Sequence, residues 1–144
     1  MDIYTFDVET KSVVPSMQHF GGLEPWRVRH GTSIISSAAV CNPNGTVEQI
    51  INDGPDFVGK LTAMLKRLED QVVYAHFTVF DIAWCIATLQ PDRMGDIPEL
   101  IRRIRWRDTA LLARWLVNGQ KAEQLNVSYS LASMCSVSPP NSSN

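Results

Sequence analysis

The sequence of 144 residues lacks several features that mark common classes of protein. Its three cysteines, Cys41, Cys85 and Cys135, are far apart and form no CxxC pair, which argues against a zinc site or a disulfide framework. The three histidines have no metal-ligand spacing either. No apolar run approaches the length of a membrane span, and no signal segment precedes the first predicted strand. The sequence therefore predicts a cytoplasmic protein without a membrane partner.

An excess of positive charge is also lacking. Lysine and arginine number 13 against 15 acids, so the formal net charge is -2. Any binding of nucleic acid would therefore have to come from a local patch or a metal site. One concentration of basic residues exists, and it is either a phosphate-contacting patch or a solvated helix face. Its members are Arg102, Arg103, Arg105, Arg107 and Arg114.

The order of predicted elements indicates an α/β fold. Strands are predicted at residues 3–8, 34–40, 47–51, 72–75 and 104–106, and helices at 57–68, 82–89 and 109–116. The second and third strands are joined by a hairpin turn at 41–45, and residues 11–33 are predicted to form a long loop. Three antiparallel strands followed by parallel strands, connected through helices, predict a mixed sheet with helices on both faces.

The domain organisation follows from length and composition. A chain of this size with a normal apolar share forms one domain, predicted here to span residues 1–135. The last residues, 136–144 (SVSPPNSSN), are polar and rich in proline and serine, which predicts a disordered tail.

Acidic residues interrupt or follow two of the predicted strands. Side chains alternate along a strand, so Asp7 and Glu9 in IYTFDVET share one face and could together hold a hard divalent cation. The alternative is a strand that has ended and leaves two acids in water. Asp81 follows the buried strand 72–75 and is either a further ligand at the strand's carboxyl end or the N-cap of the next helix.

Two motifs in this sequence resemble a known family. Residues 6–10 (FDVET) followed by residues 75–81 (AHFTVFD) are similar to the first two motifs of the DEDD, or DnaQ-like, 3′–5′ exonucleases. Residues 106–109 (WRDT) are similar to the stretch that follows the second motif in this family, and residues 23–27 (LEPWR) resemble, more specifically, the proofreading domains of phage family A DNA polymerases. The resemblance covers the chain to about residue 135 and implies a ribonuclease H-like fold.

The resemblance also implies a chemistry. In this family, four carboxylates hold two divalent cations, Mg²⁺ or Mn²⁺, which activate water for attack on a phosphodiester. By resemblance, Asp7 would bridge both ions, Glu9 would hold the one nearest the attacking water, and Asp81 would hold the other. The implied substrate is single-stranded DNA or a frayed 3′ end.

Three further positions are implied as substrate contacts, namely Thr10, His76 and Phe77. The second motif of the family usually reads A-H-N-x-x-F-D, so Phe77 stands where the family has asparagine. Two interpretations of Phe77 remain open: its ring stacks on a base of the substrate, or it fills a gap in the core.

The third motif of the family, a general-base Tyr or His followed by a fourth Asp, is missing. No aspartate follows Asp108, no histidine follows His76, and the one later acid is Glu123. We therefore expect a chain that is truncated before the third motif. Three hypotheses follow: an exonuclease with impaired activity, a non-catalytic module that binds nucleic acid or protein, and a subunit completed in trans by a polymerase or another chain.

Overall fold

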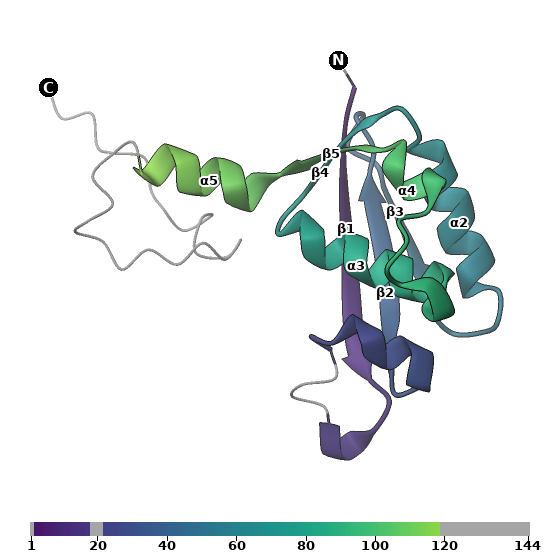
Figure 1. Ribbon diagram of the computed structural model, residues 1–144. Helices are drawn as coiled ribbons and strands as arrows, with labels where there is room; N and C mark the ends of the chain where they lie inside the picture. The colour runs from purple at the N-terminus through teal and green to yellow at the C-terminus, as the bar shows by residue number, and fades with distance from the viewer. Residues whose placement is uncertain (1, 18–21, 119–144) are drawn as a thin grey trace, which may run out of the picture.

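The computed structural model describes residues 2–17 and 22–118, in which five strands form a single sheet with the order β3-β2-β1-β4-β5 (Figure 1). The strands are β1 (Ile3–Ser12), β2 (Ser33–Cys41), β3 (Val47–Ile51), β4 (Val72–Ala75) and β5 (Arg105–Asp108). All five were predicted, although β1 continues four residues beyond the predicted end because Thr10, Lys11 and Ser12 still pair with β2.

The sheet has an antiparallel half and a parallel half. β1, β2 and β3 pair antiparallel, and the tight turn between β2 and β3 includes Gly45 at φ 84°, a backbone conformation that favours glycine. β4 pairs parallel with both β1 and β5. This confirms the predicted α/β mixed sheet.

Helices connect the parallel strands, as predicted. The α-helices are α2 (Phe57–Arg67), α3 (Thr78–Leu89), α4 (Glu99–Arg102) and α5 (Thr109–Asn118). The excursion predicted as a loop contains the 3-10 helices η1 (Pro15–Met17) and η2 (Pro25–His30), and η3 (Pro91–Arg93) follows α3. None of the helices in the described ranges is both long and apolar enough to cross a membrane.

The hydrophobic core lies between one face of the sheet and α2, α3 and α4. Phe6 and Val8 of β1 point into it together with Leu61 and Leu65 of α2 and Trp84 of α3, and all five side chains are buried. Burying this apolar surface is the main driving force of the fold. The alternate residues of β1 lie on the opposite face of the sheet, which the packed helices leave open. Among the described residues α2, α3 and α4 thus cover one face, so the prediction of helices on both faces is wrong for this part of the chain.

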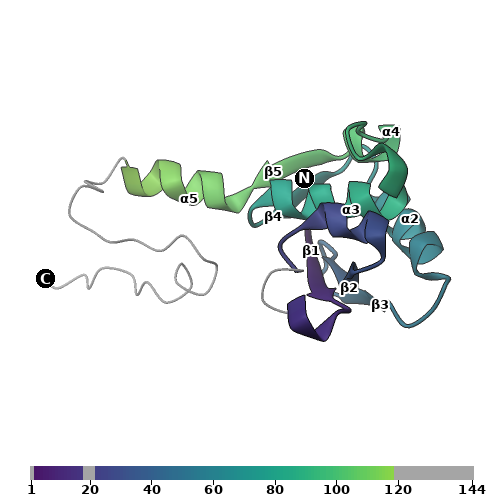
Figure 2. The same ribbon diagram turned by 60° about the horizontal axis from the view of Figure 1, so that its bottom comes forward.

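Helix α5 extends away from the sheet in both views (Figures 1 and 2). Its apolar residues include Leu111 at 62% exposed and Trp115 at 74% exposed, whereas Ala110 and Ala113 are buried. The C-terminal part of the predicted domain and the predicted tail, residues 119–135 and 136–144, lie outside the described residues.

Candidate active site

The acids of the first motif lie where the alternation of β1 predicts. Asp7 and Glu9 are exposed on the open face of the sheet, while Phe6 and Val8 between and beside them are buried. The pairing with β2 slips by one residue directly after Glu9. Because this slip comes after both acids, Asp7 and Glu9 lie in regularly paired strand, two residues apart and on the same face.

Asp81 enters the site from α3 and is held by the backbone of β1. Its side chain is 1% exposed, and its Oδ1 accepts a hydrogen bond of 3.0 Å from the Val8 N–H. β4 pairs with β1 only as far as Thr5, so the Val8 amide lies beyond the end of β4 and needs another acceptor. The hydrogen bond fixes Asp81 beside the strand that carries Asp7. Asp81 is not the N-cap of α3, because the cap position is Phe77.

The acids influence one another electrostatically. Burial raises the pKa of Asp81 to about 7; the Val8 N–H counteracts part of this increase, while the charge of Asp7 adds to it. Partial burial, and then the charge of Glu9, raises the pKa of Asp7. Asp7 thus lies within electrostatic range of both other acids. A divalent cation bound among them would relieve this repulsion, so the donor set suits Mg²⁺ or Mn²⁺ chemically.

The side chains are not gathered into a complete coordination sphere. Within residues 2–17 and 22–118, no three His, Cys, Asp or Glu side chains form a group that could hold a metal ion. Asp7 and Glu9 are exposed and free to adopt other rotamers, whereas Asp81 is fixed by its hydrogen bond. A complete set of metal ligands would therefore form by rotation of the Asp7 and Glu9 side chains of β1 toward Asp81.

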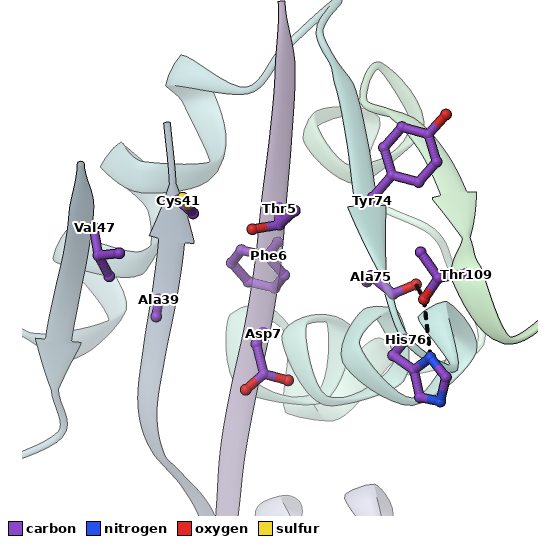
Figure 3. A pocket seen from close by; sticks show the side chains of 10 residues that line it. All are labelled: Thr5, Phe6, Asp7, Ala39, Cys41, Val47, Tyr74, Ala75, His76 and Thr109. Carbon is purple, nitrogen blue, oxygen red and sulfur yellow. Dashed lines mark hydrogen bonds between the residues drawn. The ribbon is translucent and has the colours of Figure 1, made fainter. Parts of the chain in front are cut away.

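A pocket of about 360 Å³ opens on the free face of the sheet beside Asp7 (Figure 3). Figure 3 shows Asp7 among side chains from the neighbouring strands, with His76 following β4 on one side and β2 on the other. Its other lining residues are Thr5, Phe6, Ala39, Cys41, Val47, Tyr74, Ala75 and Thr109. Sequence reasoning missed Tyr74, although its position in β4 places it on the same face as Thr5, with which it pairs.

His76, which lines this pocket, and its neighbour Phe77 follow β4. His76 Nδ1 and Thr109 Oγ1 are 2.9 Å apart, and the His76 ring meets the Phe77 ring edge to face at 4.8 Å. Phe77 is 41% exposed and has φ 58°, and the Arg114 guanidinium lies 5.7 Å from its ring centroid. This exposure argues against core packing, and base stacking stays a prediction.

Thr10 is half-buried at the far end of β1. Its Oγ1 donates to the carbonyl oxygen of Gly22, a bond of 2.5 Å that ties the excursion to the strand. A Cβ at Gly22 would lie 3.4 Å from both Thr10 oxygens, so a residue without a side chain suits this approach. The Thr10 hydroxyl proton is therefore used within the protein, while its oxygen can still accept a bond.

Asp108 organises the second motif from outside it. Its Oδ1 accepts hydrogen bonds from the N–H groups of Phe77 and Ala110, and its Oδ2 accepts one from Thr78. It thus caps α5 and also holds the turn that begins α3. The charge of Asp108 contributes to the raised pKa of Asp81.

The five arginines of the basic concentration do not share one helix face. Arg102 is the last residue of α4 and donates a hydrogen bond to the carbonyl oxygen of Ile97. Arg103 pairs with Glu69 and Asp70 at the end of α2. Arg105 and Arg107 are exposed on β5, and Arg114 lies over Phe77. The helix-face interpretation is wrong for Arg105 and Arg107, since both belong to a strand. Glu123, the one later acid, lies outside the described residues.

Comparisons with known proteins place the fold. No family model matches this chain, and no curated protein matches it. One similar solved structure is a family B DNA polymerase of the hyperthermophilic archaeon Pyrobaculum calidifontis, with 18% identity and a TM-score of 0.45 over 69% of this chain and 13% of that one.

NrnC of Brucella melitensis, in a structure bound to pGG, is similar over 99% of this chain, with 20% identity and a TM-score of 0.52. The chain spans about half the length of NrnC, of which 56% is covered. The likeness concerns the fold and does not single out phage family A polymerases. The chain has a ribonuclease H-like α/β fold with a mixed five-stranded sheet.

Proposed function

We propose that this chain is a metal-dependent 3′–5′ exonuclease domain that hydrolyses phosphodiester bonds at DNA 3′ ends. The observation that carries the proposal is the arrangement of Asp7, Glu9 and Asp81. Two exposed acids share one face of β1, and a buried acid from α3 is hydrogen-bonded to the same strand. Burying a carboxylate beside like charges is costly, and such an arrangement is typical of functional sites.

The proposed roles are those that the resemblance to the DEDD exonucleases implies. Asp7, which is electrostatically coupled to both other acids, would hold both cations, and Glu9 and Asp81 would hold one each. When bound, the cations would activate water and neutralise charge on the leaving oxygen. Thr10 and His76 would position the terminal nucleotide, and the exposed Phe77 ring would stack on a base.

The more specific proposal is a proofreading type of domain, similar to those of phage family A DNA polymerases. The support is the segment between β1 and β2, whose residues 23–27 (LEPWR) carry the resemblance. Within it η2 packs on α3 and β2, and Gly22 contacts Thr10. A polymerase, or a chain that supplies a Tyr or His and a fourth Asp, is the corresponding partner. The fourth carboxylate and the general base are required for full activity because such a site acts as a unit.

The test uses the 144-residue chain and a 5′-labelled single-stranded DNA. With Mg²⁺ or Mn²⁺ we expect a ladder of products shortened from the 3′ end, and none with EDTA. Asp7→Ala should abolish the ladder, whereas Asp92→Ala, which removes an 84% exposed acid on η3, should leave it unchanged. Shortening that survives Asp7→Ala, or its absence in every cation, would contradict the proposal for this chain.

The second candidate is a non-catalytic module that keeps the fold and binds nucleic acid or protein. It is favoured by one observation: among the described residues, no three potential ligands form a metal-binding group. This candidate predicts that DNA binds equally well with and without divalent cations and is never shortened. Addition of a partner chain that carries the missing motif distinguishes it from completion in trans, which predicts that hydrolysis appears.

A further inference from the structure

Two arginines on β5 lie on the same open face of the sheet as the acids. In β5, Trp106 meets Phe6 edge to face at 5.7 Å and packs against the core. Because side chains alternate, Arg105 and Arg107 point to the opposite face, where both are exposed. This is the face on which Asp7 and the pocket lie.

The strand register places these arginines in line with the pocket. Arg107 pairs with Tyr74, and Tyr74 pairs with Thr5. One row of side chains therefore crosses from β5 to β1, and Asp7 is the next residue of β1 on this face. At ~4.8 Å between strands, Arg107 is about 10 Å from β1, within reach of a neighbouring phosphate of a strand bound at Asp7.

The character of this surface is complementary to single-stranded nucleic acid. On this face β4 and β5 present Val72, Tyr74, Arg105 and Arg107, which together give an apolar and aromatic surface edged by two positive charges. Aromatic rings stack on bases of any sequence, and guanidinium groups pair with phosphates. Arg103, by contrast, is already paired with Glu69 and Asp70.

We propose that the open face of β4 and β5 is a binding surface for the single strand next to its 3′ end, with Arg105 and Arg107 on phosphates and Tyr74 against a base. This inference rests on the proposed function for the class of ligand. It assigns positioning residues outside the acidic motifs. The strand would run across the parallel half of the sheet toward Asp7.

The test measures binding of a fluorescein-labelled dT10 oligonucleotide to the 144-residue chain in EDTA, where hydrolysis is suppressed, at several salt concentrations. Arg105→Gln with Arg107→Gln should weaken binding by about tenfold or more at low salt and lower the slope of log K against log salt by about 1.4, since each single-strand phosphate contact contributes ~0.7. Tyr74→Leu should weaken binding without changing the slope, because stacking releases no counterions.

The matched control is Arg67→Gln with Arg93→Gln, which removes the same charge from α2 and η3 in the helical layer. Arg105→Lys with Arg107→Lys should keep both the affinity and the salt slope of the parent chain. Thermal melting verifies that every variant is folded. Equal Kd and slope in the two double glutamine variants, or no binding by the parent chain, would overturn the inference. Cleavage in Mn²⁺ is scored separately: arginine-dependent binding without cleavage overturns the exonuclease proposal alone, and cleavage without arginine dependence overturns this surface alone.

Discussion

At the scale of single residues, the most informative group of the candidate site is the buried carboxyl group of Asp81. Asp81 combines almost complete burial with a hydrogen bond to β1 and two neighbouring acids. Burial and charge repulsion oppose its ionisation, while the Val8 N–H favours it. Asp81 is therefore the residue whose protonation state and metal response report most directly on the site.

The raised pKa of Asp81 predicts how stability depends on pH. Its folded-state pKa of about 7 lies above the unfolded value, so its contribution to stability is fully present below pH 4 and is lost as the pH rises through 7. In EDTA, urea unfolding should show stability falling across this range, by up to about 1.4 kcal/mol per pH unit for one proton.

Asp81→Asn keeps an acceptor for the Val8 N–H but cannot ionise, so most of this slope should disappear. The variant should be the more stable protein at pH 8 and nearly equal to the parent at pH 4. The raised pKa of Asp7 leaves a smaller slope of the same sign. Asp92→Asn is the control and should keep the parent slope; an unchanged slope in Asp81→Asn would refute this assignment.

Divalent cations should stabilise the folded chain at pH 8 whether or not it cleaves DNA. Ligand that binds only the folded state adds about 2.7 kcal/mol at a hundred times its Kd. A rise in Tm on adding Mn²⁺, lost in Asp7→Asn and kept in Asp92→Asn, is the expected result. A rise that is the same in all three proteins would place the bound ion elsewhere.

The backbone conformation at Phe77 predicts that asparagine at this position is more stable than alanine. Phe77 has φ 58°, a left-handed conformation that asparagine adopts more readily than other non-glycine residues. Because both Phe77→Asn and Phe77→Ala remove the ring, their difference isolates the backbone. We expect the asparagine variant to be more stable than the alanine variant by about 0.5–1 kcal/mol in chemical denaturation. Equal stabilities would mean that the surroundings alone set this conformation.

At the scale of elements, the start of helix α3 depends on Asp108, the last residue of strand β5. Asp108 accepts three backbone hydrogen bonds, two from the Phe77–Thr78 turn and one from α5. Asp108→Ala removes the acceptor for all three, and we expect a loss of about 2 kcal/mol. Asp92→Ala should cost less than about 0.5 kcal/mol in the same measurement.

The elements were largely predictable from the sequence, whereas the residue that holds the start of α3 and the contacts between elements were not. Alternation in β1 gave the face of Asp7 and Glu9, and Val72–Ala75 was found with its observed bounds. Of the two alternatives for Asp81, the N-cap was wrong because the N-terminus of α3 is held by Asp108, which lies 30 positions from Thr78 and which local propensity cannot reveal. The split of the arginines depended in the same way on the register of β5 with β4.

At the scale of the whole molecule, stability is concentrated on one face of the sheet. Two leucines provide a matched comparison: Leu65 of α2 is fully buried, and Leu111 of α5 is 62% exposed. Leu65→Ala should lower the free energy of unfolding by about 3 kcal/mol, and Leu111→Ala should lower it by less than about 0.5 kcal/mol. A large loss at Leu111, measured by urea unfolding, would show that another part of the chain covers α5.

The unequal lengths of β1 and β4 impose a limit on any sequence that uses this scaffold. β4 ends before it reaches the level of Val8 in β1. The Asp81 carboxylate accepts the hydrogen bond of the Val8 N–H, in the place that a longer β4 would occupy. Two more residues of β4 would satisfy the Val8 amide with a backbone carbonyl and displace the acid. Insertions should therefore be tolerated in the β2–β3 hairpin turn but not between residues 75 and 78. The shortness of β4 is thus what keeps Asp81 beside β1, and a redesigned version of this fold must retain it to keep that placement.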